Sequence, residues 1–221
     1  MDSGKSVALA TLILTAVAGF CDTATFVAGN AIFSAHVTGN FVVFAAQVAR
    51  GQDASAYIKL ITFPVFIVAV ITGGWLIRKQ YPILMIQGWL LVLTGIMAWQ
   101  APLWGTTGIV MMTVFAMGLQ NAFGKTFAKA THGPTTMMTG NVTQASLDLG
   151  TLIFNSGTDK AATYQSLKRI GITIGGFLIG CVSGALLGKY IGLACLVLPG
   201  VAMLLCYFAV HEHFYEGNQK N

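Results

Sequence analysis

Apolar segments that approach the length of a lipid bilayer occupy most of this chain. A membrane-spanning helix needs about 20 consecutive apolar residues. Short polar turns separate eight such segments, approximately residues 6–29, 32–50, 57–77, 82–100, 106–123, 135–154, 167–187 and 191–210. Only 9% of the residues are charged, whereas soluble domains carry about 25%. The sequence therefore predicts an all-α polytopic membrane protein with one transmembrane domain, residues 1–221, whose last residues, 211–221, form a polar tail.

The second and sixth apolar segments contain the same polar tripeptide. Thr38-Gly39-Asn40 recurs as Thr139-Gly140-Asn141. The flanking residues also correspond, and the pairs are Gly19 with Gly118, Asp22 with Asn121, and Gln47 with Asp148. Matched polar residues inside apolar segments are unusual, so we expect a duplicated four-segment unit, with repeat one at 1–101 and repeat two at 102–210.

The distribution of basic residues distinguishes two topologies. Eight full crossings would place seven Lys and Arg residues on the N-terminal side and five on the other. Six full crossings, with the second and sixth segments as short or broken helices, would place nine on the N-terminal side and three, Arg50, Lys59 and Lys189, on the other. Because cytoplasmic loops are enriched in Lys and Arg, the second count favours six crossings plus two broken helices, and therefore inverted repeats; eight crossings is the alternative.

The two Thr-Gly-Asn elements are candidates for a solute site. Thr or Asn before an apolar helix is a good N-cap, and a helix N-terminus in the middle of a membrane offers free N–H groups to an anion or to the oxygen of a neutral solute. The alternative is a helix–helix contact in which small residues pack and Asn bonds across. The residues predicted to bind the solute are Asp22, Thr38, Gly39, Asn40, Gln120, Asn121, Thr139, Gly140, Asn141 and Gln144.

Three titratable residues are candidates for proton coupling. Asp22 lies within an apolar segment, where a carboxyl group is costly and marks a functional site by default. Its counterpart Asn121 is neutral, so the pair carries at most one charge. His36 could relay a proton, and Asp148 is the third candidate. The alternative for Asp22 is a structural hydrogen bond to Asn121 or Thr38.

Glycines recur every four residues in the seventh segment, at Gly176, Gly180, Gly184 and Gly188. Such a smooth face allows close helix packing, which we expect inside the protein, although it would also suit a homodimer interface. The sequence contains no catalytic triad, metal-ligand motif or nucleotide fingerprint. We therefore expect no enzymatic activity, no metal, no other cofactor and no nucleic-acid partner; the expected partners are the lipid bilayer and a small molecule or ion.

Four motifs resemble the YoaK-like family of bacterial multi-spanning membrane proteins. They are Ala18-Gly19-Phe20-x-Asp22, His36-x-Thr38-Gly39-Asn40, Gly118-Leu119-Gln120-Asn121-Ala122 and Thr136-x-x-Thr139-Gly140. The resemblance covers most of the chain and implies a multi-pass protein of the bacterial inner membrane.

These features together predict a membrane transporter that binds a small solute where the two repeats meet and that couples its transport to protons. One alternative is a passive channel for a small neutral or anionic solute. The other is a membrane scaffold or sensor that transports nothing, with Thr-Gly-Asn elements packed together and no cavity beside them.

Overall fold

The computed structural model describes residues 3–51, 56–100, 105–127, 131–154 and 160–215. All regular secondary structure in these ranges is helical. In chain order the helices are α1 (Ser3–Ala28), α2 (Gly39–Ala49), α3 (Ile58–Arg78), α4 (Ile83–Trp99), α6 (Thr106–Thr126), α7 (Met138–Phe154), α8 (Lys160–Ile191), the 3-10 helix η1 (Gly192–Leu196) and α9 (Val197–Tyr215).

Several helices are long and apolar enough to cross a membrane. In the described part of the chain these are Gly4–Ala28, Ile58–Arg78, Thr106–Thr126 and the continuous helical stretch Lys160–Ala209, which contains α8, η1 and most of α9. Gly39–Ala49 and Ile83–Trp99 are shorter apolar helices. The predicted all-helical class is therefore confirmed for the described residues, and the length and apolar composition of these helices are consistent with a helical membrane protein.

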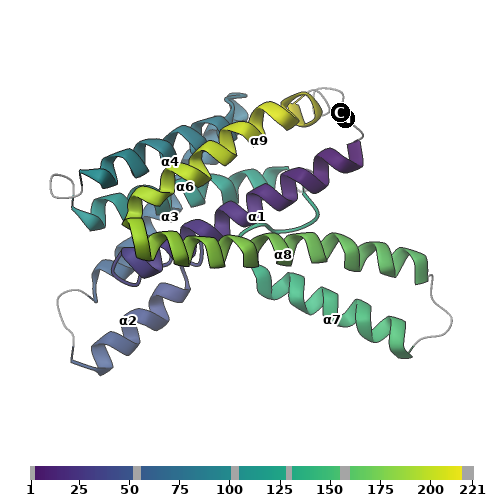
Figure 1. Ribbon diagram of the computed structural model, residues 1–221, viewed down its shortest axis with the longest axis horizontal. Helices are drawn as coiled ribbons and strands as arrows, with labels where there is room; N and C mark the ends of the chain where they lie inside the picture. Colours follow the sequence, from purple (N-terminus) through teal and green to yellow (C-terminus); the bar gives the residue numbers. More distant parts are fainter. Residues whose placement is uncertain (1–2, 52–55, 101–104, 128–130, 155–159, 216–221) are drawn as a thin grey trace.

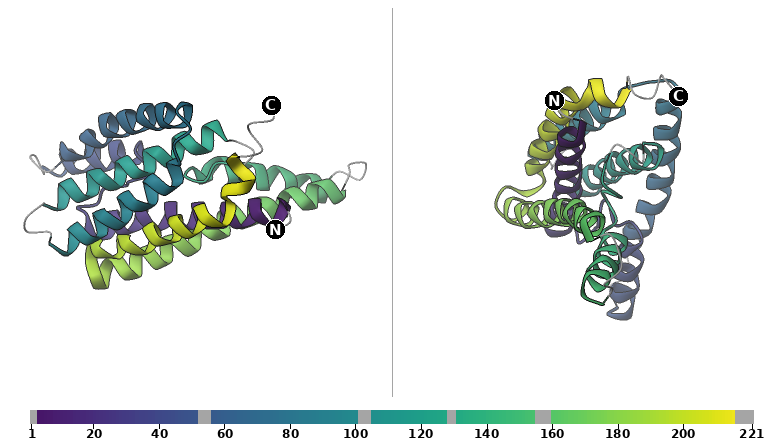
Figure 2. Two further views of the ribbon diagram at one scale, coloured as in Figure 1. Left: turned by 90° about the horizontal axis from the view of Figure 1, so that it is seen from above. Right: turned by 90° about the vertical axis from the view of Figure 1, so that its right-hand side faces the viewer.

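Most helices run roughly along one axis of the molecule, and two others diverge from its middle (Figure 1). The aligned helices are α1, α3, α4, α6, α8 and α9. α2 and α7 begin near the middle and run toward opposite ends. In the end-on view of Figure 2, both lie on the same side of the bundle. The two N-termini of α2 and α7 thus face the central region.

A short irregular segment, residues 29–38, connects α1 to α2. The second apolar segment, approximately residues 32–50, was expected to be a short or broken helix, and α2 begins only at Gly39. α1 ends at Ala28, and Asn30 and Ala31 follow with φ angles of 63° and 54°. These left-handed conformations cannot continue a right-handed helix, so the chain reverses at this point. We call residues 29–38 the first loop and the corresponding residues 131–137 the second loop.

The glycine face of α8 packs directly on α1. A methyl group added to Gly180 would overlap the carbonyl oxygen of Ala16, and one added to Gly184 would overlap that of Phe20. A methyl group added to Gly176 would overlap Oγ1 of Thr15, and one added to Gly188 would lie tightly against the Cα atom of Ala24. The predicted close packing inside the protein is confirmed, because these four glycines are buried against α1.

The main helix pairings occur in matched sets. α1 packs on α8, as α6 packs on α3; α2 packs on α3, as α7 packs on α8; α4 packs on α6, as α9 packs on α1; and α4 packs on α9. Gly19 of α1 abuts the carbonyl oxygen of Phe177, and Gly118 of α6 abuts that of Phe66. Exchanging α1–α4 with α6–α9 therefore maps each of these pairings onto another one.

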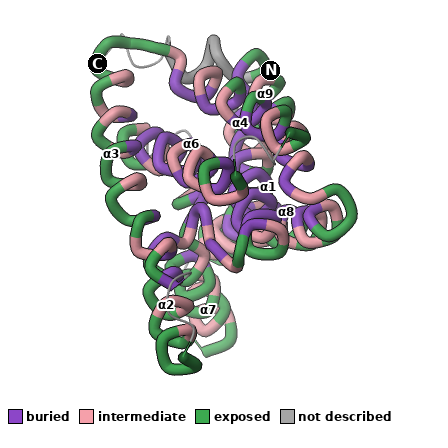
Figure 3. The backbone as a smooth tube through the Cα atoms, turned by 90° about the vertical axis from the view of Figure 1, so that its left-hand side faces the viewer, coloured by how far each residue is buried: buried purple, intermediate pink, exposed green. Residues whose placement is uncertain are grey.

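Large apolar side chains cover the outer surface, and polar groups enter the core. Exposed residues run along the outer helices (Figure 3), and examples are Ile67 and Ile71 on α3 and Leu178 and Val182 on α8. In a soluble protein so large an apolar surface would be unusual, but it suits contact with lipid tails. Buried polar residues include Asp22, Asn40, Gln87, Gln120 and Asn141.

Candidate functional site

Asp22 holds the first loop against α1. Its side chain is only 4% exposed. Oδ1 accepts hydrogen bonds from the backbone N–H groups of Ala35 at 2.7 Å and His36 at 3.2 Å, and Oδ2 lies 2.5 Å from Nδ1 of His36. Neither Asn121 nor Thr38, the partners considered from the sequence, bonds to this carboxylate in the described residues. Hydrogen bonds donated to a carboxylate stabilise its charged form and so offset the cost of burying it.

The imidazole of His36 is bonded to Asp22 on one edge and is partly exposed. Its side chain is 36% exposed, and its ring packs edge-on against Phe33 and against Phe177 of α8. The hydrogen bond to Asp22 raises the pKa of His36, partial burial opposes this rise, and the charge of Asp22 adds to it. Asp22 and His36 are thus a buried acid joined to a half-exposed base.

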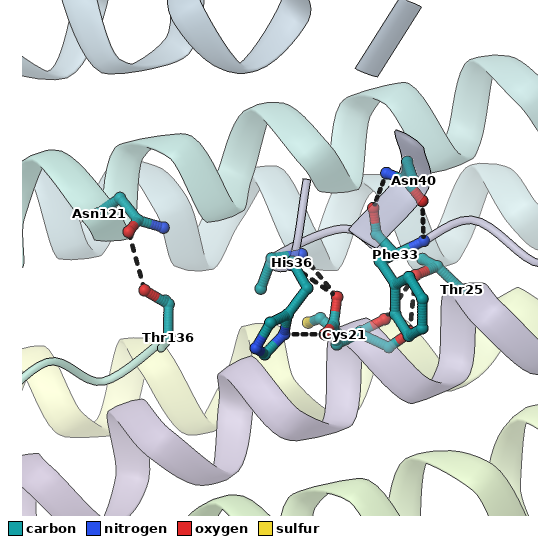
Figure 4. A network of polar contacts seen from close by, with 9 residues as sticks. Cys21, Thr25, Phe33, His36, Asn40, Asn121 and Thr136 are labelled. Carbon is teal, nitrogen blue, oxygen red and sulfur yellow. Dashed lines mark hydrogen bonds and ion pairs between the residues drawn. The ribbon is translucent and has the colours of Figure 1, made fainter. Parts of the chain in front are cut away.

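Asn40 connects the first loop to α2 and α3. Its Oδ1 accepts from the N–H of Phe33 and its Nδ2 donates to the carbonyl oxygen of Phe33, both at 2.8 Å. Nδ2 also donates to Oγ1 of Thr62 on α3 at 3.1 Å. Figure 4 shows the paired contacts between Asn40 and Phe33. Thr38 occupies the N-cap position of α2 but makes no capping hydrogen bond through its side chain, so Asn40, and not Thr38, holds the start of this helix.

The second loop is held by equivalent residues. Oδ1 of Asn121, on α6, accepts from Oγ1 of Thr136 at 2.8 Å (Figure 4). Nδ2 of Asn141 donates to the carbonyl oxygen of Pro134 at 2.9 Å, and Pro134 precedes Asn141 by seven residues, as Phe33 precedes Asn40. Pro134 has no N–H to return to the amide. The second loop therefore lacks one hydrogen bond that the first loop has.

Gln120 braces the centre of the bundle. Its Nε2 donates to the carbonyl oxygen of Leu14 on α1 at 2.8 Å and to Oγ1 of Thr135 at 3.1 Å. Its Oε1 accepts from Nε2 of Gln87 on α4 at 2.8 Å. Gln87 was not singled out from the sequence, although a glutamine inside an apolar segment is a signal that could have revealed it. Because these bonds occupy the Gln120 amide, it ties α1, α4, α6 and the second loop together.

The polar stripes on α2 and α7 face neighbouring helices. Asn40 reaches Thr62 of α3. Asp148 accepts from Nε2 of Gln144 at 2.7 Å and from Oγ of Ser166 on α8 at 2.6 Å. The seven-residue spacing of Asn40 and Gln47, and the matching spacing of Asn141 and Asp148 with Gln144 between them, predict two polar stripes that line a polar path. In the structure each stripe bonds to a helix of its own half, and the path itself stays a prediction.

Within each Thr-Gly-Asn element, some residues are buried and others are exposed. Asn40 and Asn141 are buried, whereas Thr38, Thr139 and Gly140 are exposed. Among the described residues, no hydrogen bond joins one element directly to the other. The buried asparagines therefore fix the loops, and the exposed Thr and Gly residues remain open to contact with a ligand.

Two cavities adjoin the second loop. One, of about 230 Å³, is lined by Gln120, Asn121, Lys125, Thr135 and Thr136 among others. The other, of about 490 Å³, lies toward α7 and α8, and its lining includes His132, Gln144, Ser166 and Arg169. Gly133 and Pro134 border both cavities. The second loop therefore contributes to the walls of both cavities.

The fold, the apolar exterior and the polar interior define a helical membrane protein with two polar loops buried in its bundle. Comparison with known families identifies it further. Residues 10–209 match the DUF1275 family, described as a protein of unknown function, and the chain belongs to that family. Searches of curated proteins and of solved structures returned no match.

Proposed function

We propose that this protein is a membrane transporter for a small solute, with a central site where two inverted repeats meet. One observation supports this proposal most strongly. Each half interrupts an apolar segment with a polar loop, and Asp22 or Asn121 of the preceding long helix bonds to that loop. Interrupted helices at corresponding positions of two halves form the binding sites of many transporters.

The duplication is supported by contacts as well as by sequence. The helix pairings match when α1–α4 are exchanged with α6–α9. Asn40 and Asn141 each donate to the carbonyl oxygen seven residues earlier. We therefore assign residues 1–101 and 102–210 to two related repeats.

We propose six full crossings, made by α1, α3, α4, α6, α8 and α9. α2 and α7 would enter from the centre and leave toward opposite faces, in keeping with their divergence in Figure 1. This topology places nine Lys and Arg residues on the N-terminal side and three on the other. The N-terminal side then faces the cytoplasm, in the inner membrane of a bacterium, as the YoaK-like resemblance implies.

The pair of Asp22 and His36 is our candidate for proton coupling. Asp22 is buried, while His36 is partly exposed and bonded to it. A proton arriving at the exposed edge of the imidazole can pass to the carboxylate through Nδ1. The second repeat has Asn121 and Met137 at the corresponding positions, so this relay would exist in one half only.

The test uses proteoliposomes loaded with a pH-sensitive dye and a screen of small acids, amides and ions. We expect one solute to drive proton movement, and we expect Asp22→Asn to abolish that movement while leaving some solute flux. Asp148→Asn changes an outlying carboxylate of α7 and is the matched control, because Asp148 bonds only to Gln144 and Ser166 in the described residues. Equal loss in both variants would refute the assignment of coupling to Asp22.

A passive channel is the alternative favoured by the open cavities beside the second loop. It predicts solute flux that does not depend on a proton gradient and that survives Asp22→Asn. A scaffold or sensor without transport predicts no flux of any solute. A homodimer, if it forms, must use a surface other than the four buried glycines of α8, because these contact α1.

A further inference from the structure

The cavity between the second loop, α7 and α8 differs chemically from the region around Asp22. Its volume is about 490 Å³, and five polar or charged residues are among those that line it: His132, Asn141, Gln144, Ser166 and Arg169. Since one water molecule occupies about 30 Å³ of liquid, the cavity has room for an organic molecule and not only for an ion.

The charge lining this cavity is positive. Arg169 is exposed, and it forms no ion pair with any acidic side chain in the described residues. Asp148 forms hydrogen bonds with two of the lining residues, Gln144 and Ser166, but it is not itself part of the lining. Gln144 and Ser166 each donate a hydrogen bond to Asp148, so this acid is bonded to neutral donors and leaves Arg169 unpaired.

The positive charge of Arg169 affects the pKa of the neighbouring His132. Burial, and then the charge of Arg169, lower the pKa of His132. A positive potential that disfavours a second cation favours an anion in the same space. The first turn of α7, which contributes Gly140 and Asn141 to the lining, adds backbone N–H groups of the same polarity.

We propose that this cavity binds a small oxyanion, a carboxylate or a phosphate, with Arg169 as its principal charged contact. Guanidinium groups bind both chemistries through paired hydrogen bonds. The proposal that the cavity binds an oxyanion does not depend on the proposed function. The further step, that this oxyanion is the transported solute, rests on the proposed function.

The experiment compares a charged probe with a neutral one of the same shape. Purified protein in phosphatidylcholine nanodiscs is titrated with acetate, with inorganic phosphate and with acetamide, at constant ionic strength, and binding is measured by calorimetry. We expect acetate or phosphate to bind and acetamide not to bind. Arg169→Gln should weaken binding by about tenfold or more, as expected for the loss of a charge-assisted hydrogen bond, and Arg169→Lys should weaken it less.

Lys168→Gln is the matched control. Lys168 is the adjacent exposed cation on α8 but does not line the cavity, so binding by this variant should stay within about twofold of the unmodified protein, as expected for a surface charge. Equal losses in the Lys168 and Arg169 variants, or equal binding of acetate and acetamide, would overturn the site. The absence of binding by both anions at millimolar concentrations would also overturn it.

A second arm distinguishes a dissolved anion from a lipid headgroup. The thermal unfolding midpoint is measured in nanodiscs of phosphatidylcholine with and without phosphatidylglycerol. Stabilisation by phosphatidylglycerol alone, lost in Arg169→Gln, would assign the oxyanion to lipid and overturn its assignment to a solute. Proton-coupled flux lost in Asp22→Asn but unaffected by Arg169→Gln would leave the proposed function standing while refuting the anionic solute.

Discussion

Asn40 and its counterpart Asn141 should contribute unequally to stability, and the structure gives the reason. Replacing Asn40 by Ala removes two hydrogen bonds of 2.8 Å to Phe33 and one of 3.1 Å to Thr62. Hydrogen bonds between side chains in membrane proteins contribute about 0.6 kcal/mol each on average. The substitution also leaves the N–H of Phe33 without its acceptor, which costs about 1 to 3 kcal/mol where the group is buried.

The expected loss for Asn40→Ala is therefore about 3 to 5 kcal/mol in the free energy of unfolding. Asn141→Ala removes bonds of 2.9 Å to Pro134 and 3.3 Å to Met137 but leaves no N–H of residue 134 unpaired. We expect it to cost about 1 kcal/mol. The change in side-chain volume is the same in both variants, so the difference between them reports on the hydrogen bonds.

The measurement is reversible unfolding in mixed detergent micelles, followed by tryptophan fluorescence. Thr62→Val removes the third bond of Asn40 together with the bond from Oγ1 of Thr62 to the carbonyl oxygen of Lys59. Because the second bond does not involve Asn40, a double-mutant cycle with Asn40→Ala isolates the Asn40–Thr62 bond from the two to Phe33. Equal losses in the Asn40 and Asn141 variants, or a larger loss at Asn141, would refute the argument that the missing N–H of Pro134 weakens the second loop.

Two further predictions concern packing and pH. Gly180→Ala should destabilise the protein by about 1 to 3 kcal/mol, because the added methyl group meets the backbone of Ala16; Gly175→Ala, where nothing lies within 4 Å, should have no such cost, and equal thermal midpoints would contradict this packing. Because its bond to Asp22 raises the pKa of His36, the stability gained from protonated His36 is fully present below its unfolded pKa of about 6.5 and is lost as pH rises through the raised value. Unfolding midpoints from pH 5.5 to 8.5 should show this loss, and an unchanged pH profile in His36→Gln would contradict it.

The sequence allowed the helical membrane class and the two interrupted segments to be predicted, because polar residues and Gly inside apolar segments are strong local signals. It also indicated that α8 packs closely through its glycines. The partners of Asp22 could not be predicted. They are mainly backbone N–H groups of Ala35 and His36, which every residue except proline carries, and they depend on how the first loop folds back.

The orientation of α7 was equally hidden from the sequence. Spacing placed Asn141, Gln144 and Asp148 on one face, but only the packing of α7 decides what that face contacts, and it contacts α8 through Ser166. Lys59 is a similar case. The topology comparison counted it as a charge on one side of the membrane, yet its side chain is almost completely buried, and α2 packs on the helix that carries it.

The interlacing of the two halves has a mechanical consequence. α1 is locked to α8 through glycine contacts, and α6 is locked to α3 through Gly73 and Gly118, so each tight pair takes one helix from either half. The halves cannot separate as rigid bodies without breaking these backbone contacts. A motion that keeps these contacts must move α1 together with α8 and α3 together with α6, so its moving units cannot be the two halves of the sequence.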